Sequence, residues 1–325
     1  MTIYNPNSIL ITGGSGFLGS NFKILLRSLY PNVTIINIDK IDYCSKEEKI
    51  DGKYIFYKDN INNSEILKII LLRYKIDTVI HIAAQTHVDN SFNNSIEFTK
   101  DNVLGTHNLI DCCYKYGKDI KRFIHISTDE VYGTVDNNHK GCNENAVLDP
   151  TNPYSASKAG AEFIVKSYNY SYKFPVIITR GNNIYGPRQY PEKIVPICIE
   201  RLFLDNKIDI HGKGEARRNF IHVDDVSNAI ITIMQKGEIG KIYNIGTNNE
   251  YSVMEIVSII KNMIYPNKSI EEVVNYIDDR LFQDKRYAID STELRALGWS
   301  EKIPFNEGLK KTIEWYNNNR EYFIA

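Results

Sequence analysis

Four residues of this sequence have the types and spacing needed to take a proton from a hydroxyl group while hydride leaves the same carbon. Tyr154 and Lys158 are four residues apart near the start of a predicted helix, so their side chains share one face. A nearby ammonium group favours the phenolate of a tyrosine, which can then act as a base near neutral pH. Thr128, or Ser127 beside it, ends an apolar run and can hydrogen-bond the same oxygen.

Two adjacent carboxylates, Asp129 and Glu130, directly follow this hydroxyl group, although hydride transfer does not need them. An elimination of water beside a newly formed ketone does need both an acid and a base. We assign the base to Glu130 and the acid to Asp129, whose pKa must then lie well above its reference of ~3.9. Exclusion of water and repulsion from Glu130 both act in that direction. The alternative is that both carboxylates are solvated loop residues.

A glycine-rich stretch, "ILITGGSGFLGSNF", lies between a predicted strand and a predicted helix. Both the Gly14-x-Gly16-x-x-Gly19 spacing and the wider Gly13-x-x-Gly16-x-x-Gly19 spacing match the dinucleotide fingerprint, in which backbone N–H groups approach a pyrophosphate. Asp39 ends the next strand, where a carboxylate accepts hydrogen bonds from a ribose and repels a 2′-phosphate. The pattern therefore favours NAD over NADP, and Lys40 is the one residue that weakens this preference.

The elements that must position these residues follow an alternating pattern. Short β-branched runs at 8–12, 34–39, 78–83, 122–127 and 175–180 alternate with helical patterns at 17–29, 64–74 and 99–116. This alternation predicts an α/β fold with a Rossmann-type doubly wound parallel sheet. The regularity ends after 180, where a strand at 241–246 and a helix near 252–264 stand among loops.

Two domains follow from this change of pattern. We predict an NAD-binding Rossmann domain of residues 1–187 and 222–247. A smaller, mostly C-terminal α/β substrate domain would comprise residues 188–221 and 248–325. The site is expected in the cleft between them, at the carboxyl ends of the strands.

Composition excludes several classes of protein. The formal net charge is −1 without a basic block, so we expect no nucleic-acid partner. Five cysteines without a CxxC pair predict a reducing compartment, with no disulfide framework and no metal. The N-terminus lacks the pattern of a signal peptide, and no stretch approaches the ~20 apolar residues of a membrane span. We therefore expect a cytoplasmic protein without a membrane partner.

Together these motifs resemble the extended short-chain dehydrogenase/reductase family, over essentially the whole chain. "STDEVYG" (127–133) is similar at every position to the active-site segment of nucleoside-diphosphate-glucose 4,6-dehydratases. The resemblance implies oxidation at C4, elimination of water across C5 and C6, and return of hydride to C6. The alternatives are a UDP-sugar 4-epimerase or decarboxylase, which would not need both carboxylates, and an NAD-binding regulatory protein that has lost catalysis.

The motifs and the resemblance together assign the cofactor contacts. In this family the segment 83–85 lines the cofactor, and Asn102 has a structural or proton-relay role. The family's "GDI" reads Asp59-Asn60-Ile61 here, so the adenine contact is shared between Asp59 and Asn60. The full set is Gly13, Gly16, Phe17, Leu18, Gly19, Asp39, Lys40, Asn60, Ile61, Ala83, Ala84, Gln85, Asn102, Ser127, Tyr154 and Lys158.

The same resemblance implies contacts to the substrate. His87 of "AAQTHVDNSF" would lie near the sugar together with Thr128, and Asn183 of "TRGNNIYGP" would contact the diphosphate. Lys193 is a weaker candidate for the same role. Arg218, and not its neighbour Arg217, matches a phosphate-binding arginine, and Arg280 would be a second clamp.

Four segments, "AAQTHVDNSF", "TNPYSASKAGAE", "RGNNIYGP" and "LKKTIEWY", are most similar to the dehydratase domain of plant-type UDP-rhamnose synthases. This implies UDP-glucose as substrate, with dTDP-glucose as the alternative. The chain ends where that domain ends, so we expect a separate epimerase/reductase to complete UDP-rhamnose or another deoxysugar. The resemblance also implies a homodimer through helices near 99–116 and 154–172, where Ala156, Ala159, Ala161 and Phe163 permit close packing.

Overall fold

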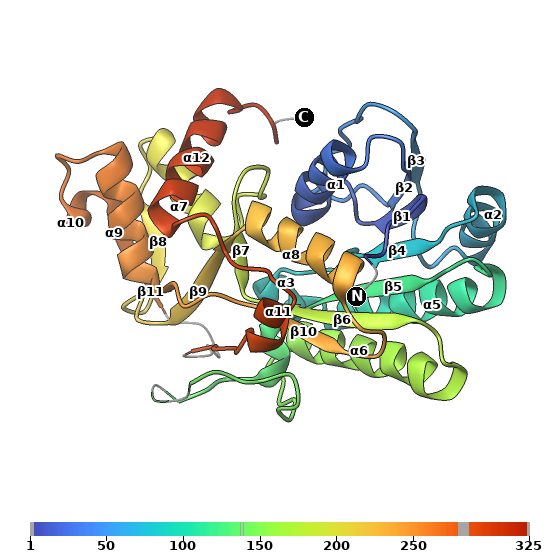
Figure 1. Cartoon of the computed structure of the whole chain (residues 1–325). Coiled ribbons are helices and arrows are strands. Elements are labelled where there is room, and N and C mark those ends of the chain that lie inside the picture. Colours follow the sequence, from blue (N-terminus) through green and yellow to red (C-terminus); the bar gives the residue numbers. More distant parts are fainter. Residues whose placement is uncertain (1–2, 137, 139, 279–285, 324–325) are drawn as a thin grey trace.

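A seven-stranded parallel sheet forms the centre of the computed structural model, which describes residues 3–136, 138, 140–278 and 286–323 (Figure 1). The strand order is β10-β6-β5-β4-β1-β2-β3, and all neighbours are parallel. The predicted doubly wound sheet is thus confirmed. Its strands are β1 (Ser8–Thr12), β2 (Thr34–Asp39), β3 (Tyr54–Lys58), β4 (Thr78–His81), β5 (Arg122–Thr128), β6 (Val176–Gly181) and β10 (Ile242–Ile245).

Helices cover both faces of this sheet. α1 (Phe17–Leu29) and α8 (Val223–Lys236) pack on one face, and α2 (Ser64–Tyr74), α5 (Gly105–Tyr116) and α6 (Pro153–Tyr172) pack on the other (Figure 1). Neighbouring residues of one strand point to opposite faces, so Ile9 joins the core beneath α1 and α8, while Leu10 joins the core beneath α2, α5 and α6. Burial on both faces explains why the strands are almost continuously apolar.

The order of the strands reverses at β1, which lies between β2 and β4. At such a switch point the two crossover connections diverge and leave a crevice at the carboxyl ends of the strands. The glycine-rich stretch follows β1, Asp39 ends β2, and Thr128 ends β5, so all three lie at this edge.

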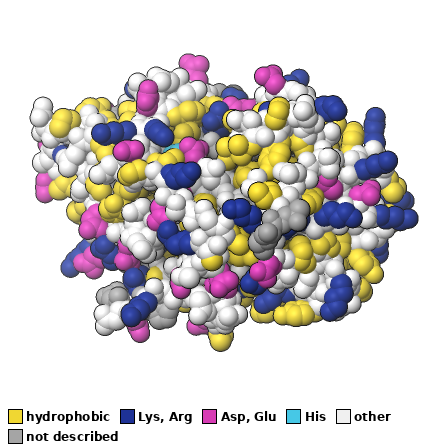
Figure 2. Space-filling view, in the orientation of Figure 1, with side chains coloured by type: hydrophobic (Ala, Val, Ile, Leu, Met, Phe, Trp, Pro, Cys, Tyr) yellow, Lys and Arg dark blue, Asp and Glu magenta, His cyan; other side chains and the backbone are white. Residues whose placement is uncertain are grey.

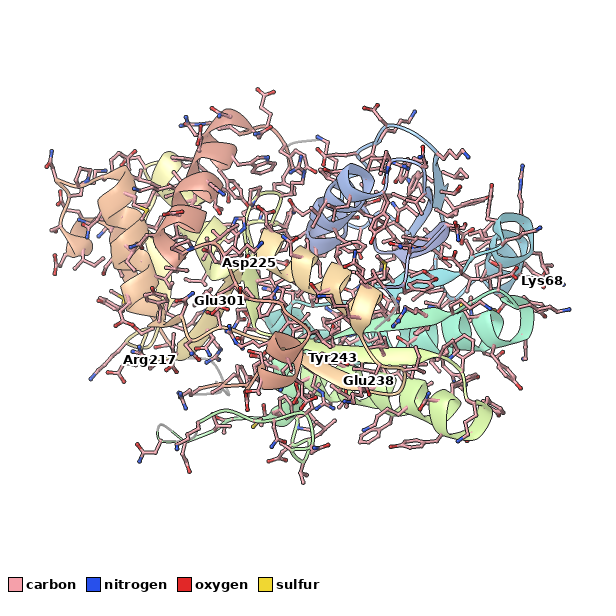
Figure 3. All side chains as sticks on the ribbon, viewed as in Figure 1. Lys68, Arg217, Asp225, Glu238, Tyr243 and Glu301 are labelled. Carbon is pink, nitrogen blue, oxygen red and sulfur yellow. The ribbon has the colours of Figure 1, made fainter. Side chains whose placement is uncertain are left out.

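The remaining elements form a second layered unit with its own apolar core. It contains the sheet β11-β9-β7, with β7 (Asn183–Tyr185), β9 (Arg217–His222) and β11 (Glu250–Ser252), and the pair β8 (Ile208–His211) and β12 (Val274–Ile277). Its helices are α7 (Ile194–Phe203), α9 (Val253–Ile264), α10 (Ile270–Val273) and α12 (Phe305–Asn318), while α11 (Thr292–Ala296) packs against β10. Asp225 of α8, labelled in Figure 3, accepts the N–H groups of Lys302 and Ile303 and ties this unit to the sheet.

Two local features differ from the predicted pattern. Strand β3 was not among the predicted runs, because Tyr54–Lys58 is a half-buried edge strand without a long apolar stretch. The segment predicted as one helix at 99–116 begins as a π-helical turn, η1 (Thr99–Leu104), before α5. Two short helices, α3 (Val88–Asn93) and α4 (Ser95–Phe98), precede it, and a 3₁₀ turn, η2 (Asp129–Tyr132), follows β5. π-helical turns occur frequently at functional sites.

The surface in view carries positive and negative side chains interspersed (Figure 2). Among the described residues, no helix combines the length and the apolar character needed to cross a membrane. Within the same ranges, no three His, Cys, Asp or Glu side chains are grouped so that they could hold a metal ion. All five cysteines are free, and only Cys44 is not fully buried.

Candidate active site

A cavity of about 890 Å³ lies at the carboxyl edge of the seven-stranded sheet. Gly13, Asp39 and Thr128 line it from the sheet, and Arg218 and Tyr251 line it from the second unit. A volume of this order falls within the range of natural ligand pockets. The cavity therefore occupies the cleft in which the sequence places both cofactor and substrate.

The glycine-rich stretch forms a turn into which side chains would not fit. Gly13 has a φ of +72°, and a Cβ atom there would lie 2.7 Å from the backbone of Ala83. A Cβ atom on Gly19 would lie 2.6 Å from the Cα atom of Gly14. Gly16 caps α1 without a side-chain hydrogen bond, so the first N–H groups of the helix are open to a ligand. The cavity is lined by Gly13, Gly16, Phe17, Leu18 and Gly19.

Asp39 is buried at the end of β2 and lines the same cavity. Its carboxylate accepts the backbone N–H groups of Ser15 at 3.0 Å and of Ile41 at 2.9 Å. Lys40 Nζ lies 3.0 Å from Asp42 Oδ2 and 2.8 Å from Asp101 Oδ2. Because two carboxylates already neutralise this ammonium group, Lys40 is poorly placed to hold a 2′-phosphate.

The other predicted cofactor contacts line the cavity as well, except for Asn102. Asn60, Ile61, Ala83, Ala84, Gln85 and Ser127 are lining residues. Asn102 lies behind them in η1 and holds the backbone of Gln85 at both N–H (2.7 Å) and C=O (3.0 Å). Its amide also donates to Ser157 Oγ at 2.8 Å. Of the two roles implied for Asn102, the contacts among the described residues match the structural one.

The five candidate catalytic residues come together where β5 meets α6. Thr128 ends β5 and caps η2, and a capping box of Asn152 and Ser155 starts α6 so that Tyr154 faces the cavity. Thr128 lies close enough to Tyr154 to lower the pKa of its phenol. Lys158, one turn further along α6, donates from Nζ to the carbonyl oxygen of Ile126 at 2.7 Å.

Asp129 is fully buried, and burial raises its pKa to about 7. Asn182 donates to Asp129 Oδ2 at 2.7 Å and lowers this pKa, whereas the charge of Glu130 raises it. Glu130 itself accepts a hydrogen bond from Asn152 Nδ2 at 3.4 Å. A carboxyl group that is partly protonated at neutral pH can donate a proton to a leaving group.

The electrostatics of Tyr154 differ from the sequence-based expectation. Burial raises its pKa, the charges of Glu130 and Asp129 raise it further, and only the neighbouring Thr128 lowers it. Lys158 does not contribute to lowering it; burial lowers the pKa of Lys158 itself to about 8, against the charge of Glu162. The reason is that both side chains are desolvated. The phenolate therefore requires further positive charge, which fits a site completed by the cationic ring of NAD⁺.

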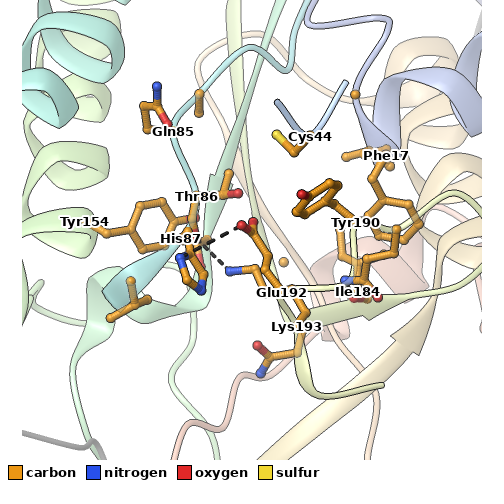
Figure 4. Close-up of a pocket in the computed structure, with 18 of the residues that line it drawn as sticks. Phe17, Cys44, Gln85, Thr86, His87, Tyr154, Ile184, Tyr190, Glu192 and Lys193 are labelled. Atoms are coloured by element: carbon orange, nitrogen blue, oxygen red, sulfur yellow. Dashed lines mark hydrogen bonds and ion pairs between the residues drawn. The ribbon is translucent and has the colours of Figure 1, made fainter. Parts of the chain in front are cut away.

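His87 and Lys193 approach each other across the mouth of the cavity. His87 caps α3, and its Nδ1 lies 3.9 Å from Glu192 Oε2, while Lys193 Nζ donates to the carbonyl oxygen of Thr86 at 2.7 Å (Figure 4). Figure 4 shows Tyr154 on the same side as His87, opposite Tyr190. Both predicted residues thus line the cavity.

The remaining substrate candidates lie at the end of the cavity that the second unit forms. Asn183 lines it, and its buried Nδ2 has no hydrogen-bond partner among the described residues, as expected of a donor reserved for a ligand. Arg218 lines the cavity with its guanidinium group over the ring of Tyr287, 4.5 Å from the centroid. Arg217 instead points to the edge of the molecule and pairs with Glu250 and Glu255 (Figure 3). Arg280 lies outside the described residues.

Sequence reasoning missed several residues that shape this site. Asn182 and Asn152 hold the two carboxylates, and Tyr43 donates to Glu192 at 2.7 Å beside His87. Two features of the sequence could have indicated Asn182 and Asn152: the two consecutive asparagines of "GNNIYGP" and the Asn-Pro pair at the start of α6. The Tyr43–Glu192 contact joins distant segments, and no local pattern indicates it.

Comparisons with known proteins identify relatives of this chain. The model of the family described as GDP-mannose 4,6 dehydratase matches residues 10–312. A dTDP-D-glucose 4,6-dehydratase of Dictyostelium discoideum is 46% identical, over 97% of this chain and 83% of the relative. A trifunctional UDP-glucose 4,6-dehydratase, epimerase and reductase of Arabidopsis thaliana is 44% identical over 99% of this chain, which spans about half (49%) of that relative's length.

Solved structures extend the likeness to three dimensions. The dTDP-glucose 4,6-dehydratase DesIV of Streptomyces venezuelae, solved with NAD bound, has a TM-score of 0.91 at 33% identity and covers 97% of this chain and 98% of its own. A UDP-glucose 4-epimerase of Thermotoga maritima has a TM-score of 0.87 at 28% identity, covering 97% and 100%.

The chain belongs to the GDP-mannose 4,6 dehydratase family, within the extended short-chain dehydrogenases/reductases. It is an NAD-dependent nucleotide-sugar 4,6-dehydratase, a hydro-lyase. Three features of this chain fit NAD: a glycine-rich turn without room for side chains, a start of α1 without a side-chain cap, and the buried Asp39.

Proposed function

We propose that this chain removes water from UDP-glucose to give UDP-4-keto-6-deoxyglucose, with dTDP-glucose as the second candidate substrate. The observation that carries the proposal is the buried Asp129, whose pKa is raised to about 7, directly between Thr128 and Glu130 in the cavity wall. A sugar oxidoreductase or a 4-epimerase has no use for such an acid. The chemistry that NAD supplies when bound is reversible hydride transfer, from C4 first and to C6 last.

The first role of the protein is to take the proton from the C4 hydroxyl group. Tyr154 is the base for this proton, and Thr128, which lies beside it, holds the same sugar oxygen. Lys158, buried beneath Tyr154 and anchored on Ile126, supplies positive charge when it is protonated. The result is a ketone at C4, which acidifies the hydrogen at C5.

The second role is the elimination itself. Glu130 takes the proton from C5, the electron pair forms the C5–C6 double bond, and the C6–O bond breaks. Asp129 gives its proton to the departing hydroxyl group, which leaves as water. Hydride then adds to C6, and the protonated Glu130 returns its proton to C5, so no net oxidation remains.

The third role is to hold the nucleotide end of the substrate. Asn183 offers its unpaired amide to the diphosphate, and Arg218 and Lys193 supply positive charge beside it. Arg280 is proposed as the second arginine, and His87 as the contact to the sugar. A few positively charged side chains at the site can bind the diphosphate even though the net charge of the chain is −1.

The choice of UDP-glucose rests on the four segments that resemble plant-type UDP-rhamnose synthases and on polar residues at the far end of the cavity. UDP carries a ribose 2′-hydroxyl that dTDP lacks, and Asp209 and His211 line that end of the cavity with groups able to bind a hydroxyl. The 46% identity to a dTDP-D-glucose 4,6-dehydratase favours the second candidate. An enzyme acting downstream on the keto sugar would complete a deoxysugar such as rhamnose.

We also propose a homodimer and the two-domain division given above. Apolar side chains that a second copy would cover are exposed along η1, α5 and α6: Leu104 at 54%, Tyr114 at 45%, Phe163 at 58% and Tyr170 at 71%. The division into residues 1–187 with 222–247 and 188–221 with 248–325 is supported by the presence of separate apolar cores in the two units. The cores depart from these bounds at Tyr185, which joins the second core, and at Ile221, Leu294 and Trp299, which join the first. Sedimentation of the protein and of a Phe163→Glu variant would test the dimer.

The deciding experiment incubates the protein with UDP-glucose and, separately, with dTDP-glucose, and examines the products by mass. Loss of one water without accumulation of NADH is expected, faster with UDP-glucose. Faster conversion of dTDP-glucose would make that sugar the substrate. Unchanged mass with formation of the galacto isomer would instead indicate a 4-epimerase and would overturn the roles of Asp129 and Glu130.

A further inference from the structure

A lysine is completely buried behind the glycine-rich turn. The side chain of Lys23, on the inner face of α1, has an exposed fraction of 0%. Its Nζ lies 3.3 Å from both oxygens of Glu47, 3.3 Å from the hydroxyl of Tyr54, and over the Tyr54 ring. Its partner Glu47 is 17% exposed. A completely buried charge such as that of Lys23 is costly, since an apolar side chain of similar size is often at least as stable. The pair therefore calls for an explanation other than packing.

The pair is connected directly to the segments that surround the NAD site. Glu47 accepts hydrogen bonds from the hydroxyl of Ser15, inside the glycine-rich turn, and from Asn37 Nδ2 at 3.1 Å. Asn37 Oδ1 in turn accepts the N–H of Gly14 at 2.9 Å. The backbone N–H of Ser15 donates to Asp39 Oδ2 at 3.0 Å. Thus Glu47 holds Ser15, and Ser15 holds the carboxylate that faces the ribose.

The charges of the pair also reach that carboxylate. Burial raises the pKa of Asp39, the charge of Glu47 raises it further, and the charge of Lys23 lowers it. The two charges therefore act in opposite directions on Asp39. Neither Lys23 nor Glu47 is among the described residues that line the cavity. They can therefore act on the cofactor only without contacting it, through Ser15 and Asp39 and through their charges.

We propose that Lys23 and Glu47 are positioning residues of the NAD site, which fix Ser15 and Asp39 and, by their balanced charge, set the preference for NAD over NADP. Replacing Lys23 and replacing Glu47 should therefore change that preference in opposite directions. Without Lys23 a negative charge remains beneath the ribose, which disfavours a 2′-phosphate. Without Glu47 a positive charge remains there, which favours a 2′-phosphate.

The test measures the dissociation constants of NAD⁺ and NADP⁺ for the cofactor-stripped full chain by calorimetry, in Lys23→Met, Glu47→Gln and the matched control Lys261→Met. Lys261 is also a buried lysine, and its Nζ donates to the carbonyl oxygen of Lys268, far along the chain from the NAD site. Each single variant is expected to bind NAD⁺ about 10-fold more weakly, because the remaining partner loses its opposite charge and no longer holds Ser15 and Asp39 in place. The control should retain the affinity of the wild type for both cofactors.

The ratio of the two dissociation constants separates positioning from general support of the fold. The preference for NAD⁺ should increase in Lys23→Met and decrease in Glu47→Gln. Equal changes in both variants, or changes no larger than in Lys261→Met, would overturn the proposal. If either single variant fails to fold, the paired Lys23→Met/Glu47→Leu protein replaces it. This protein should keep its melting temperature yet bind NAD⁺ more weakly, and unchanged NAD⁺ affinity in it would also overturn the proposal.

Discussion

Asn182 donates a hydrogen bond of 2.7 Å to Asp129 Oδ2, while its own side-chain oxygen accepts the N–H of Thr247 at 3.0 Å. The second bond fixes which end of the amide faces Asp129. The residue that holds the proposed acid thus lies just beyond β6, between Gly181 and the proposed diphosphate contact Asn183. One short segment therefore carries both the hydrogen-bond partner of the proposed acid and the proposed diphosphate contact.

Replacing Asn182 by leucine should move the pH profile of dehydration. The amide hydrogen bond lowers the pKa of Asp129, so its loss raises that pKa above about 7. Because Asp129 must be protonated to act as the acid, kcat is lost as the pH rises through this pKa. The alkaline limb is therefore expected at higher pH in Asn182→Leu. Steady-state rates from pH 5 to 10 would show it, and a shift toward lower pH would contradict the assignment of the acid.

Replacing Asp129 by asparagine should stabilise the protein at alkaline pH. The pKa of Asp129 is about 7 in the folded chain and ~3.9 when unfolded, so the folded state binds the extra proton between these values. The associated stability is complete below pH ~4 and is lost as the pH rises through about 7, by roughly 4 kcal/mol at most. Melting temperatures of Asp129→Asn should accordingly fall less between pH 5 and pH 8.5 than those of the wild type.

The exposed Asp119 provides the control for this measurement. Asp119→Asn should follow the wild type across the whole pH range. If Asp129→Asn also follows it, then the proton is not bound to Asp129 in the folded state.

Much of this fold could be predicted because its signals are local. The apolar runs at 8–12 and 34–39 match β1 and β2 residue for residue, and the periodic segments 17–29 and 64–74 match α1 and α2. A short, continuous apolar run is typical of a strand that is buried on both faces of a parallel sheet, so its structure can be predicted from the sequence. Strand β3 was not predicted because an edge strand such as Tyr54–Lys58 is only half buried and lacks a continuous apolar run.

The site was predictable to the extent that its chemistry is carried by consecutive residues. Thr128, Asp129 and Glu130 are adjacent, and Tyr154 and Lys158 are one helical turn apart, so sequence alone groups them. The partners that tune them are separated along the chain, as Asn182 is from Asp129, and only the fold joins them. The burial of a side chain also cannot be determined from the sequence alone. Because burial raises the pKa of Tyr154, the prediction that Lys158 lowers this pKa was wrong.

Removing the Tyr154 hydroxyl should abolish the first proton transfer while leaving the cofactor site intact. Positioned acid–base groups contribute roughly 10²- to 10⁴-fold, so kcat of Tyr154→Phe is expected to fall by that range. The affinity for NAD⁺ should stay close to that of the wild type. Single-turnover reduction of bound NAD⁺ by UDP-glucose or dTDP-glucose would locate the loss in the oxidation step. Tyr276→Phe, at an exposed position of β12, is the control.

The buried pair of Arg180 and Glu162 predicts a large asymmetry between single and paired substitutions. Arg180 Nη2 lies 2.6 Å from Glu162 Oε2, and both side chains are at most 1% exposed. Arg180→Met leaves an unpaired buried carboxylate and is expected to cost about 3–5 kcal/mol in the free energy of unfolding. Arg180→Met/Glu162→Leu removes both charges, so it should lie much closer to the wild type. Urea unfolding of the three proteins measures this, and a paired variant as unstable as Arg180→Met would mean that the guanidinium group's bonds to Tyr132 and to the carbonyl oxygen of Glu144 dominate.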